Sequence, residues 1–222
     1  MGSRIAREPA PARRQYDNSR RRARTSDTRA RIIEAARTLF VERGYALTSV
    51  EAVADAARVA PATVYRLFGS KREILKEIID VSSGGDDLPI PFHERPEVVA
   101  LLSEPDPVRY LRRFARIVSE TSARLDPIYA VVEAAAAVDA DSAGLLALMR
   151  EQRFIGHGRV AHGLAERKAL PKGMTVPQSH DTVYALSSPE LRRVVLAQRG
   201  WTRKTYERWL FDMLSAALLQ PS

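Results

Sequence analysis

The sequence predicts an all-α protein, in which a small N-terminal unit of short helices precedes a larger C-terminal bundle of longer ones. Apolar residues recur at helical spacing, as in Ile33, Ala36 and Phe40. Ser or Thr stands three residues before Glu at 48–51 and at 70–73, which is the spacing of a capping box. No segment alternates apolar and polar residues as a half-buried strand does.

Composition limits the classes of function. The chain has 222 residues, of which 45% are hydrophobic, so it can bury a core and form one or two domains. It has no cysteine, which excludes disulfides and thiolate metal sites and fits a cytoplasmic protein. No apolar run approaches the length of a membrane span, and no apolar segment follows the N-terminal arginines as in a secretion signal. We therefore expect a cytoplasmic protein without a membrane partner.

Positive charge is concentrated at the N-terminus. The net charge of the chain is +8, and residues 1–24 contain eight arginines against only Glu8 and Asp17. Such a segment has too few apolar residues to form a core, and its preferred partner is a polyanion. We expect residues 1–24 to be a disordered arm that contacts nucleic acid; the alternative is a leader that only improves solubility.

The N-terminal unit, residues 25–82, contains four predicted helices. The first ends at Gly44, which suits the position after a helix C-terminus. Thr48 begins the second, and a three-residue break, 58–60, separates it from a helix over 61–68. Ser70 begins the fourth. Four short helices in so few residues form one compact unit.

The C-terminal unit, residues 83–222, begins with a linker over 82–96 that is rich in Gly, Asp and Pro. Pro107 and the Asp-Pro pair at 126–127 each suit the start of a helix, so we expect a break between two helices there. The remaining helices are predicted over 142–170, 176–188, 189–200 and 201–219.

The segment 61–68 has two unlike faces when it is placed on a helix. Val64 and Phe68 lie on one side, whereas Ala62, Thr63 and Arg66 lie on the other with Tyr65 at the edge. Two short helices joined by a three-residue turn, the second with an exposed polar face, form a helix-turn-helix that fits the DNA major groove.

The residue types on this face suit DNA. A small Ala62 permits close approach, Thr63 offers a hydroxyl and a methyl, Arg66 can bind guanine with two hydrogen bonds, and Tyr65 can reach a phosphate. We expect phosphate contacts also at the start of the preceding helix and from Lys71. The predicted DNA-binding residues are Thr48, Ser49, Pro61, Ala62, Thr63, Tyr65, Arg66, Leu67 and Lys71.

Residues 28–79 resemble the DNA-binding domain of the tetracycline-repressor (TetR) family. The likeness rests on the order and spacing of short matches, which are Ala35-Ala36, Leu39-Phe40, Gly44-Tyr45, Thr48, Val53-Ala54, Thr63-Val64-Tyr65, Phe68 and Ser70-Lys71. The C-terminal run over 185–218 resembles the effector domains of one subgroup. The resemblance implies a homodimer that binds a near-palindromic double-stranded DNA operator and is released by a small molecule.

Two residues depart from the family pattern. Arg58 stands where glycine is usual, because the turn often needs a positive φ, and Ala60 replaces the usual capping residue. Neither change removes the reading face. The arginine arm also has a place in this arrangement, since Arg20, Arg21, Arg22 and Arg24 can reach the neighbouring minor groove or its phosphates.

The second unit is expected to supply dimerisation and effector binding. The predicted interface residues are Leu186, Leu210, Met213, Leu214 and Ala217, and the alternative is that they only face their own core. Residues expected to line a pocket for an apolar or amphipathic effector are Phe114, Val118, Tyr129, Met149, Phe154, His157 and Trp201. The i, i+5 spacing of His157 and His162 does not place both on one helical face, so we expect no metal there.

Other functions compete with a ligand-released repressor. A ligand-independent repressor, an activator and a sequence-indifferent architectural DNA binder remain open. An enzyme built on a helical bundle is not expected, because Asp86 and Asp87 lie in the linker without a second acidic motif and no nucleophile, phosphate-loop or metal pattern stands out. We expect no cofactor.

Overall fold

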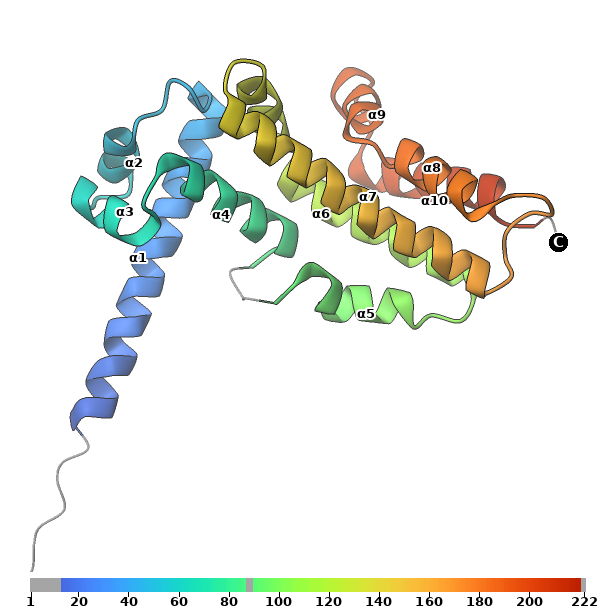
Figure 1. Cartoon of the computed structure of the whole chain (residues 1–222), viewed down its shortest axis with the longest axis horizontal. Helices are drawn as coiled ribbons and strands as arrows, with labels where there is room; N and C mark the ends of the chain where they lie inside the picture. The colour runs from blue at the N-terminus through green and yellow to red at the C-terminus, as the bar shows by residue number, and fades with distance from the viewer. Residues whose placement is uncertain (1–12, 87–89, 221–222) are drawn as a thin grey trace, which may run out of the picture.

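The computed structural model describes residues 13–86 and 90–220, and the side chains from residue 23 onward. Every regular element in these ranges is helical (Figure 1). The α-helices are α1 Arg13–Arg43, α2 Val50–Ala56, α3 Pro61–Phe68, α4 Lys71–Gly84, α5 Pro96–Leu102, α6 Pro107–Ala136, α7 Ala140–Glu166, α8 Val176–Leu186, α9 Pro189–Arg193 and α10 Arg203–Leu218. A 3₁₀ turn, Phe92–Glu94, precedes α5, and a π-helical turn, Val194–Gln198, follows α9. The predicted all-α fold is confirmed.

Helices α1 to α4 form the N-terminal unit, with α2 and α3 at the outer end (Figure 1). Helix α1 ends one residue before Gly44, whose φ of +85° is the left-handed conformation predicted for it. Ser70 caps α4 by accepting a hydrogen bond from the Glu73 amide. Helix α1 starts at Arg13, so it includes residues 13–24 of the predicted arm; residues 1–12 lie outside the described part.

The predicted break at Asp126-Pro127 is wrong, because α6 is a single helix of 30 residues with Pro127 in its interior. A proline inside a helix removes one backbone hydrogen bond and costs about 3 kcal/mol. Burial next to the proline offsets this cost, since Ile128 and Val132 are both 0% exposed. Helix α6 can therefore run the length of the C-terminal unit and pack against α4, α7 and α10.

The N-terminal unit shares its hydrophobic core with one end of the C-terminal unit. Side chains of α1 to α4 pack in one buried cluster with Ile128 and Val132 of α6 and with Leu145 and Met149 of α7. A second cluster, which includes Leu111 of α6, lies among α5, α6, α7, α8 and α10. The predicted boundary near residue 83 therefore divides the helices into two groups, whereas the first core spans both.

Close packing of α6 on α7 depends on Gly163. The Tyr110 ring is 0% exposed, and its hydroxyl lies where a side chain at Gly163 would begin. Tyr110 Oη also donates to the Val160 carbonyl over 3.5 Å. Burial raises the pKa of this phenol to about 12, so it stays protonated.

We predict that Gly163→Ala lowers the free energy of unfolding by about 1–3 kcal/mol, because the added methyl overlaps Tyr110 in a packed interior. The control is Gly156→Ala in the same helix, where an added methyl meets no atom within 4 Å. This control should raise stability by about 0.5–1 kcal/mol, since alanine is the better helix former. Urea unfolding followed by circular dichroism measures both values, and equal effects of the two changes would contradict the prediction.

Candidate nucleic-acid interface

The predicted helix-turn-helix is present. Helix α2 ends at Ala56, and α3 begins at Pro61 with Ala60 at its N-cap. The Val59 amide donates to the Ala54 carbonyl over 3.0 Å, which closes the turn. As expected from sequence, Arg58 holds the turn with a φ of +54°, and Ala60 makes no side-chain cap.

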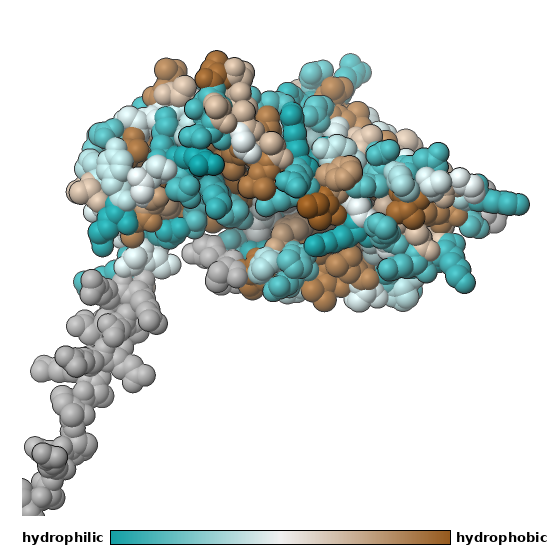
Figure 2. All heavy atoms as spheres, viewed as in Figure 1, coloured by the Kyte–Doolittle hydropathy of each residue, from teal (hydrophilic) through white to brown (hydrophobic). Residues whose placement is uncertain are grey.

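Helix α3 turns one face inward and the other to solvent. Val64 is 1% exposed and Phe68 is 8% exposed, and both belong to the first core. On the other side Ala62 and Arg66 are exposed, and Thr63 is half-buried. Hydrophilic residues predominate over α2 and α3 in Figure 2. The outward face is thus a small, polar and cationic surface on a helix narrow enough for the major groove.

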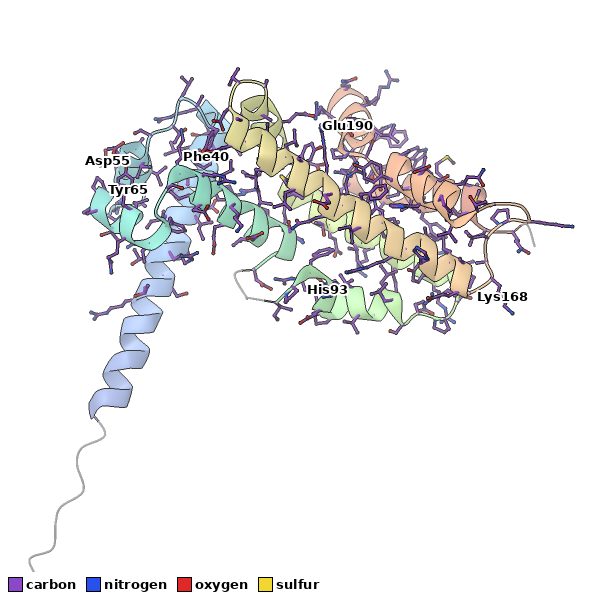
Figure 3. All side chains as sticks on the ribbon, in the orientation of Figure 1. Phe40, Asp55, Tyr65, His93, Lys168 and Glu190 are labelled. Carbon is purple, nitrogen blue, oxygen red and sulfur yellow. The ribbon has the colours of Figure 1, made fainter. Side chains whose placement is uncertain are left out.

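Two predicted contact residues of α3 also bind within the protein. The Tyr65 hydroxyl donates to the Glu51 carboxylate over 3.4 Å, although the ring is 48% exposed and lies at the outer end of the unit (Figure 3). Tyr65 must leave Glu51 to reach a phosphate. Leu67 was also predicted to contact DNA, and this prediction is wrong. Its side chain packs against the first core, so it faces the protein rather than a DNA groove.

The expectation that Thr48 contacts phosphate is wrong. Thr48 is 1% exposed, and its hydroxyl donates to the carbonyls of Leu39 and Gly44. Its neighbour Ser49 is the N-cap of α2 instead, and the Ser49 hydroxyl accepts from the Ala52 amide over 3.1 Å. Thr48 therefore fixes the end of α1 against the start of α2, and Ser49 alone lies at the surface.

Lys71 is bound to the loop between α1 and α2. Its ammonium donates to the carbonyls of Tyr45 and Thr48 over 2.9 and 3.0 Å and lies 4.2 Å from the centre of the Tyr45 ring. Burial lowers the pKa of Lys71, whereas Asp139 raises it. Two of the three ammonium hydrogens are thus used in holding the unit together, which the sequence did not indicate.

Arg29 is a residue that the sequence analysis missed. It pairs with Glu77 of α4 over 2.7 Å, donates to the Leu67 carbonyl at the end of α3, and lies over the Phe68 ring. One side chain of α1 thereby fixes α3 relative to α4. A single arginine on the polar side of a predicted helix gives no signal of such a role, because its partners come from distant parts of the chain.

The arginine arm is described by its backbone from Arg13 and by its side chains from residue 23. Arg24 is exposed on α1, whereas the side chains of Arg20, Arg21 and Arg22 lie outside the described part. The helix that carries these residues extends away from the rest of the molecule (Figure 1).

The predicted pocket residues do not line one cavity. The Phe114 and His157 rings meet edge to face at 5.5 Å, and Tyr184 joins His157 to the half-exposed Phe154. Tyr129 and Met149 lie instead in the first core. Val118 and Trp201 pack at the margin of the second core. Phe114, Phe154 and His157 are therefore together, and the other four are not.

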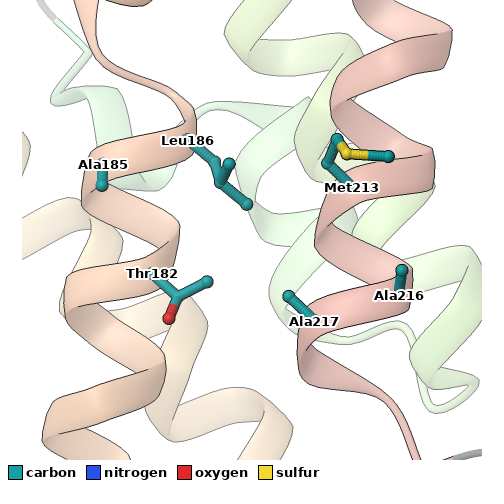
Figure 4. A pocket seen from close by; sticks show the side chains of 6 residues that line it. All are labelled: Thr182, Ala185, Leu186, Met213, Ala216 and Ala217. Carbon is teal, nitrogen blue, oxygen red and sulfur yellow. The ribbon is translucent and has the colours of Figure 1, made fainter.

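The predicted interface residues divide into two groups. Leu210 and Leu214 are 0% exposed within the second core, so they face their own chain. Leu186, Met213 and Ala217 lie in an open groove of about 530 Å³ between α8 and α10 (Figure 4). The remaining residues of this groove are Thr182, Ala185 and Ala216.

Among the described residues, no helix is long and apolar enough to cross a bilayer. The same residues hold no group of three or more His, Cys, Asp or Glu suited to a metal ion. Asp86 forms a two-point ion pair with the buried Arg95, and Asp87 lies outside the described part, so the structure describes no carboxylate pair in the linker.

Comparisons with known proteins point to one family. Residues 32–78 match the family described as bacterial regulatory proteins, tetR family. The chain is 31% identical over 74 residues to the uncharacterized HTH-type transcriptional regulator YdeS of Bacillus subtilis (strain 168). That similarity covers 33% of this chain and only 37% of the relative, about a third of its length.

Solved structures are similar over most of the chain. NalD, the secondary repressor of the MexAB-OprM multidrug efflux pump in Pseudomonas aeruginosa, superposes with a TM-score of 0.67 at 20% identity. The superposition covers 89% of this chain and 98% of that one. Salmonella enterica GusR gives a TM-score of 0.62 at 19% identity over 86% of this chain and 95% of its own. These likenesses show the fold of both units.

We predict that Arg58→Gly raises the free energy of unfolding by about 0.5–1 kcal/mol. The left-handed conformation costs a residue with a side chain about 1–2 kcal/mol, and the flexibility of glycine in the unfolded chain offsets only part of the gain. Lys76→Gly is the control, because Lys76 is exposed in the interior of α4 and this change should lower the free energy of unfolding by about 1 kcal/mol. Thermal unfolding compares the variants; a loss of stability in Arg58→Gly would refute the strain at this turn.

Proposed function

We propose that the chain is a TetR-family transcriptional regulator and that it represses transcription by binding a palindromic DNA operator as a homodimer. The observation that carries the proposal is the outward face of α3, where Ala62, Thr63 and Arg66 project from a helix fixed on its other side by Val64 and Phe68. Such a face can enter the major groove and read base edges. A regulator of this kind acts on DNA in the cytoplasm, and no catalytic role is assigned to it.

Phosphate contacts would come from residues around α3. Ser49 and the free amides at the start of α2 lie at the surface, where the helix dipole favours an anion. Pro61 is exposed at the start of α3, and Lys71 has one hydrogen beyond its two carbonyl bonds. Arg24 and the arginines before it would add contacts to DNA outside the half-site.

Dimerisation through α8 and α10 is supported by the groove between them. Its lining is almost entirely apolar, and Met213 is 38% exposed beside Leu186. Two copies that pack these helices together would cover the groove and place two α3 helices on successive turns of DNA. Because Leu210 and Leu214 already fill the core beneath, the surface residues Met213 and Ala217 would carry the contact.

Release by a small molecule is the second part of the proposal. Helix α4 of the N-terminal unit packs against α6 of the C-terminal unit, and the first core includes side chains from both units. A ligand that separates α7 from its neighbours would move α4 and, with it, the spacing of the two α3 helices. This requires a differential affinity of a few kcal/mol between two arrangements.

The test of DNA recognition is selection of bound DNA from a random pool at moderate salt. We expect a motif with two inverted half-sites. Arg66→Ala should then lose about 1–3 kcal/mol of binding free energy and relax one base position in each half-site. The control is Arg159→Ala, which removes an exposed arginine from α7. Binding without a motif would favour a sequence-indifferent DNA binder, and a uniform loss over all sequences would assign Arg66 to phosphate.

The dimer interface has a separate test. Met213→Glu places a charge in the apolar groove, and burying an unpaired carboxylate between two subunits is costly. We expect light scattering after gel filtration to show a dimer for the unchanged chain and a monomer for Met213→Glu.

Val138→Glu is the control for this test, since Val138 is 83% exposed in the turn between α6 and α7. It should remain dimeric. A dimer in both variants would place the interface elsewhere.

A further inference from the structure

Several polar side chains of the C-terminal unit are buried or half-buried. They come from α6, α7, α9 and α10, and we call them the interior polar cluster. Its members are Ser119, Asp126, Arg153, His157, Arg192 and Tyr206. Ser119 and Tyr206 are both 0% exposed, Arg192 is 6% exposed and His157 is 9% exposed. Burying so many polar groups is costly unless each finds a partner.

One ion pair within the cluster is complete. Arg192 binds both carboxylate oxygens of Asp126, over 2.6 and 2.9 Å, and donates to the Ser187 carbonyl over 2.6 Å. The carboxylate of Asp126 is therefore fully used in neutralising Arg192. This pair joins α9 to α6 and leaves no negative charge for another residue.

Arg153 is the cation that remains. Its Nη1 donates to the Tyr184 carbonyl over 2.9 Å, and its guanidinium lies 3.5 Å from the centre of the Tyr184 ring. Its Nε is buried and has no acceptor. No carboxylate of the described residues forms an ion pair with it. Burial lowers the pKa of Arg153, and Tyr184, Glu190 and Tyr129 oppose this effect only in part.

Other polar groups of the cluster are also buried. Ser119 Oγ is buried without a partner, and Tyr206 Oη faces the Arg192 guanidinium. Burial, reinforced by Arg153, His180 and Arg192, lowers the pKa of His157 to about 3, so its imidazole is neutral at physiological pH. Within the cluster Asp126 balances Arg192, whereas Arg153 has no ion-pair partner and feels Glu190 of α9 only at longer range. The polar groups without a partner include Arg153 Nε and the Ser119 hydroxyl.

The position of the cluster suits a molecule with an apolar body. Phe114 contacts His157 on α7, and Tyr129 accepts a hydrogen bond from Arg150 one turn before Arg153. Ser119 and Arg153 thus lie on the same stretch of the α6–α7 pair. The aromatic rings of Phe114, His157 and Tyr184 border this stretch.

We propose that the interior polar cluster binds the carboxylate of a small organic acid with an aromatic or apolar body, and that Arg153 is its anchor. This inference rests on the proposed function, because it names the chemical class of the effector. A carboxylate accepts from the Nε and an Nη of one guanidinium at once, which supplies the acceptor that Arg153 Nε lacks. Ser119 lies within the same stretch as a further donor.

Binding would also act on one contact between α7 and α8. Arg153 Nη1 donates to the Tyr184 carbonyl of α8, and a carboxylate that draws the guanidinium toward itself would weaken this bond, whereas the ring contacts of Phe154 with His180 and Tyr184 would remain. Helix α8 is one wall of the groove proposed as the dimer interface. An anion at Arg153 is thereby connected to the arrangement of the two subunits.

The experiment is a thermal-shift screen of the full chain with matched sets of compounds. Each set contains a monocarboxylate, its primary amide and the corresponding primary amine, such as phenylacetate, phenylacetamide and phenethylamine, with cinnamate and octanoate sets beside it. Calorimetric titration then gives the affinity of every compound that raises Tm. We expect carboxylates to bind, and amides and amines of the same shape to bind much more weakly.

Variants identify the anchor. Arg153→Gln should weaken carboxylate binding roughly 10–100-fold, as expected for a charge-assisted hydrogen-bonded pair. Arg159→Gln removes the same charge from the exposed face of α7 and should leave the affinity unchanged. If Arg153→Gln does not fold, Arg153→Lys keeps the charge without the planar fork and should bind carboxylates more weakly while still preferring them to amides.

Three results would overturn the inference: no carboxylate of the screen binds, amides or amines bind as well, or Arg153→Gln binds as the unchanged chain does. Operator binding by the ligand-free chain is measured separately. A chain that selects an operator but fails the screen keeps the proposed DNA function and loses this inference. A chain that binds carboxylates through Arg153 but selects no operator keeps this inference and loses the proposed DNA function.

Discussion

The position of α4 is the constraint on which the rest of the structure depends, because this helix joins the other helices of the N-terminal unit to the C-terminal unit. At its start, Lys71 binds the carbonyls of Tyr45 and Thr48. At its end, Arg124 of α6 donates to the carbonyls of Ser82 and Ser83 over 3.0 and 3.4 Å. The last carbonyls of a helix have no partner within it, so a guanidinium from another helix satisfies them and opposes the negative end of the dipole. The start of α4 is thus bonded to the N-terminal unit, and its end is bonded to the C-terminal unit.

The position of α3 depends on the position of α4. Helix α3 has only eight residues, which is too short to be stable alone. Its inward residues sit in the first core, and Arg29 joins its last carbonyls to Glu77 of α4. A displacement of α4 therefore carries α3 with it, whereas the outward face of α3 has no bond to the C-terminal unit. In the proposed function, DNA binding by α3 and its release by a ligand in the C-terminal unit would both act through α4.

Local signals in the sequence predicted the helices well and their partners poorly. Gly44, Ser70 and the two-faced pattern of 61–68 each depend on a few neighbouring residues, and the structure confirms them. Thr48 was misplaced because adjacent Ser and Thr residues are both good caps, and only packing against Leu39 decides between them. The break expected at Pro127 failed for a similar reason, since burial by distant helices outweighs a local preference. Helical spacing likewise cannot separate Leu214 in the core from Met213 at the surface, because the chain that covers each is unknown from sequence.

The interior polar cluster is difficult to explain by stability alone. Replacing both partners of a buried ion pair by well-packed apolar residues is often neutral or stabilising, so the pair of Asp126 and Arg192 is weak evidence for a purely structural role. Arg153 is a stronger case, because a buried N–H without an acceptor lowers stability by about 1–3 kcal/mol. An apolar side chain at this position would avoid that penalty. In the complex that we propose, the carboxylate of an effector would supply the acceptor that Arg153 Nε lacks, so that binding would remove the penalty.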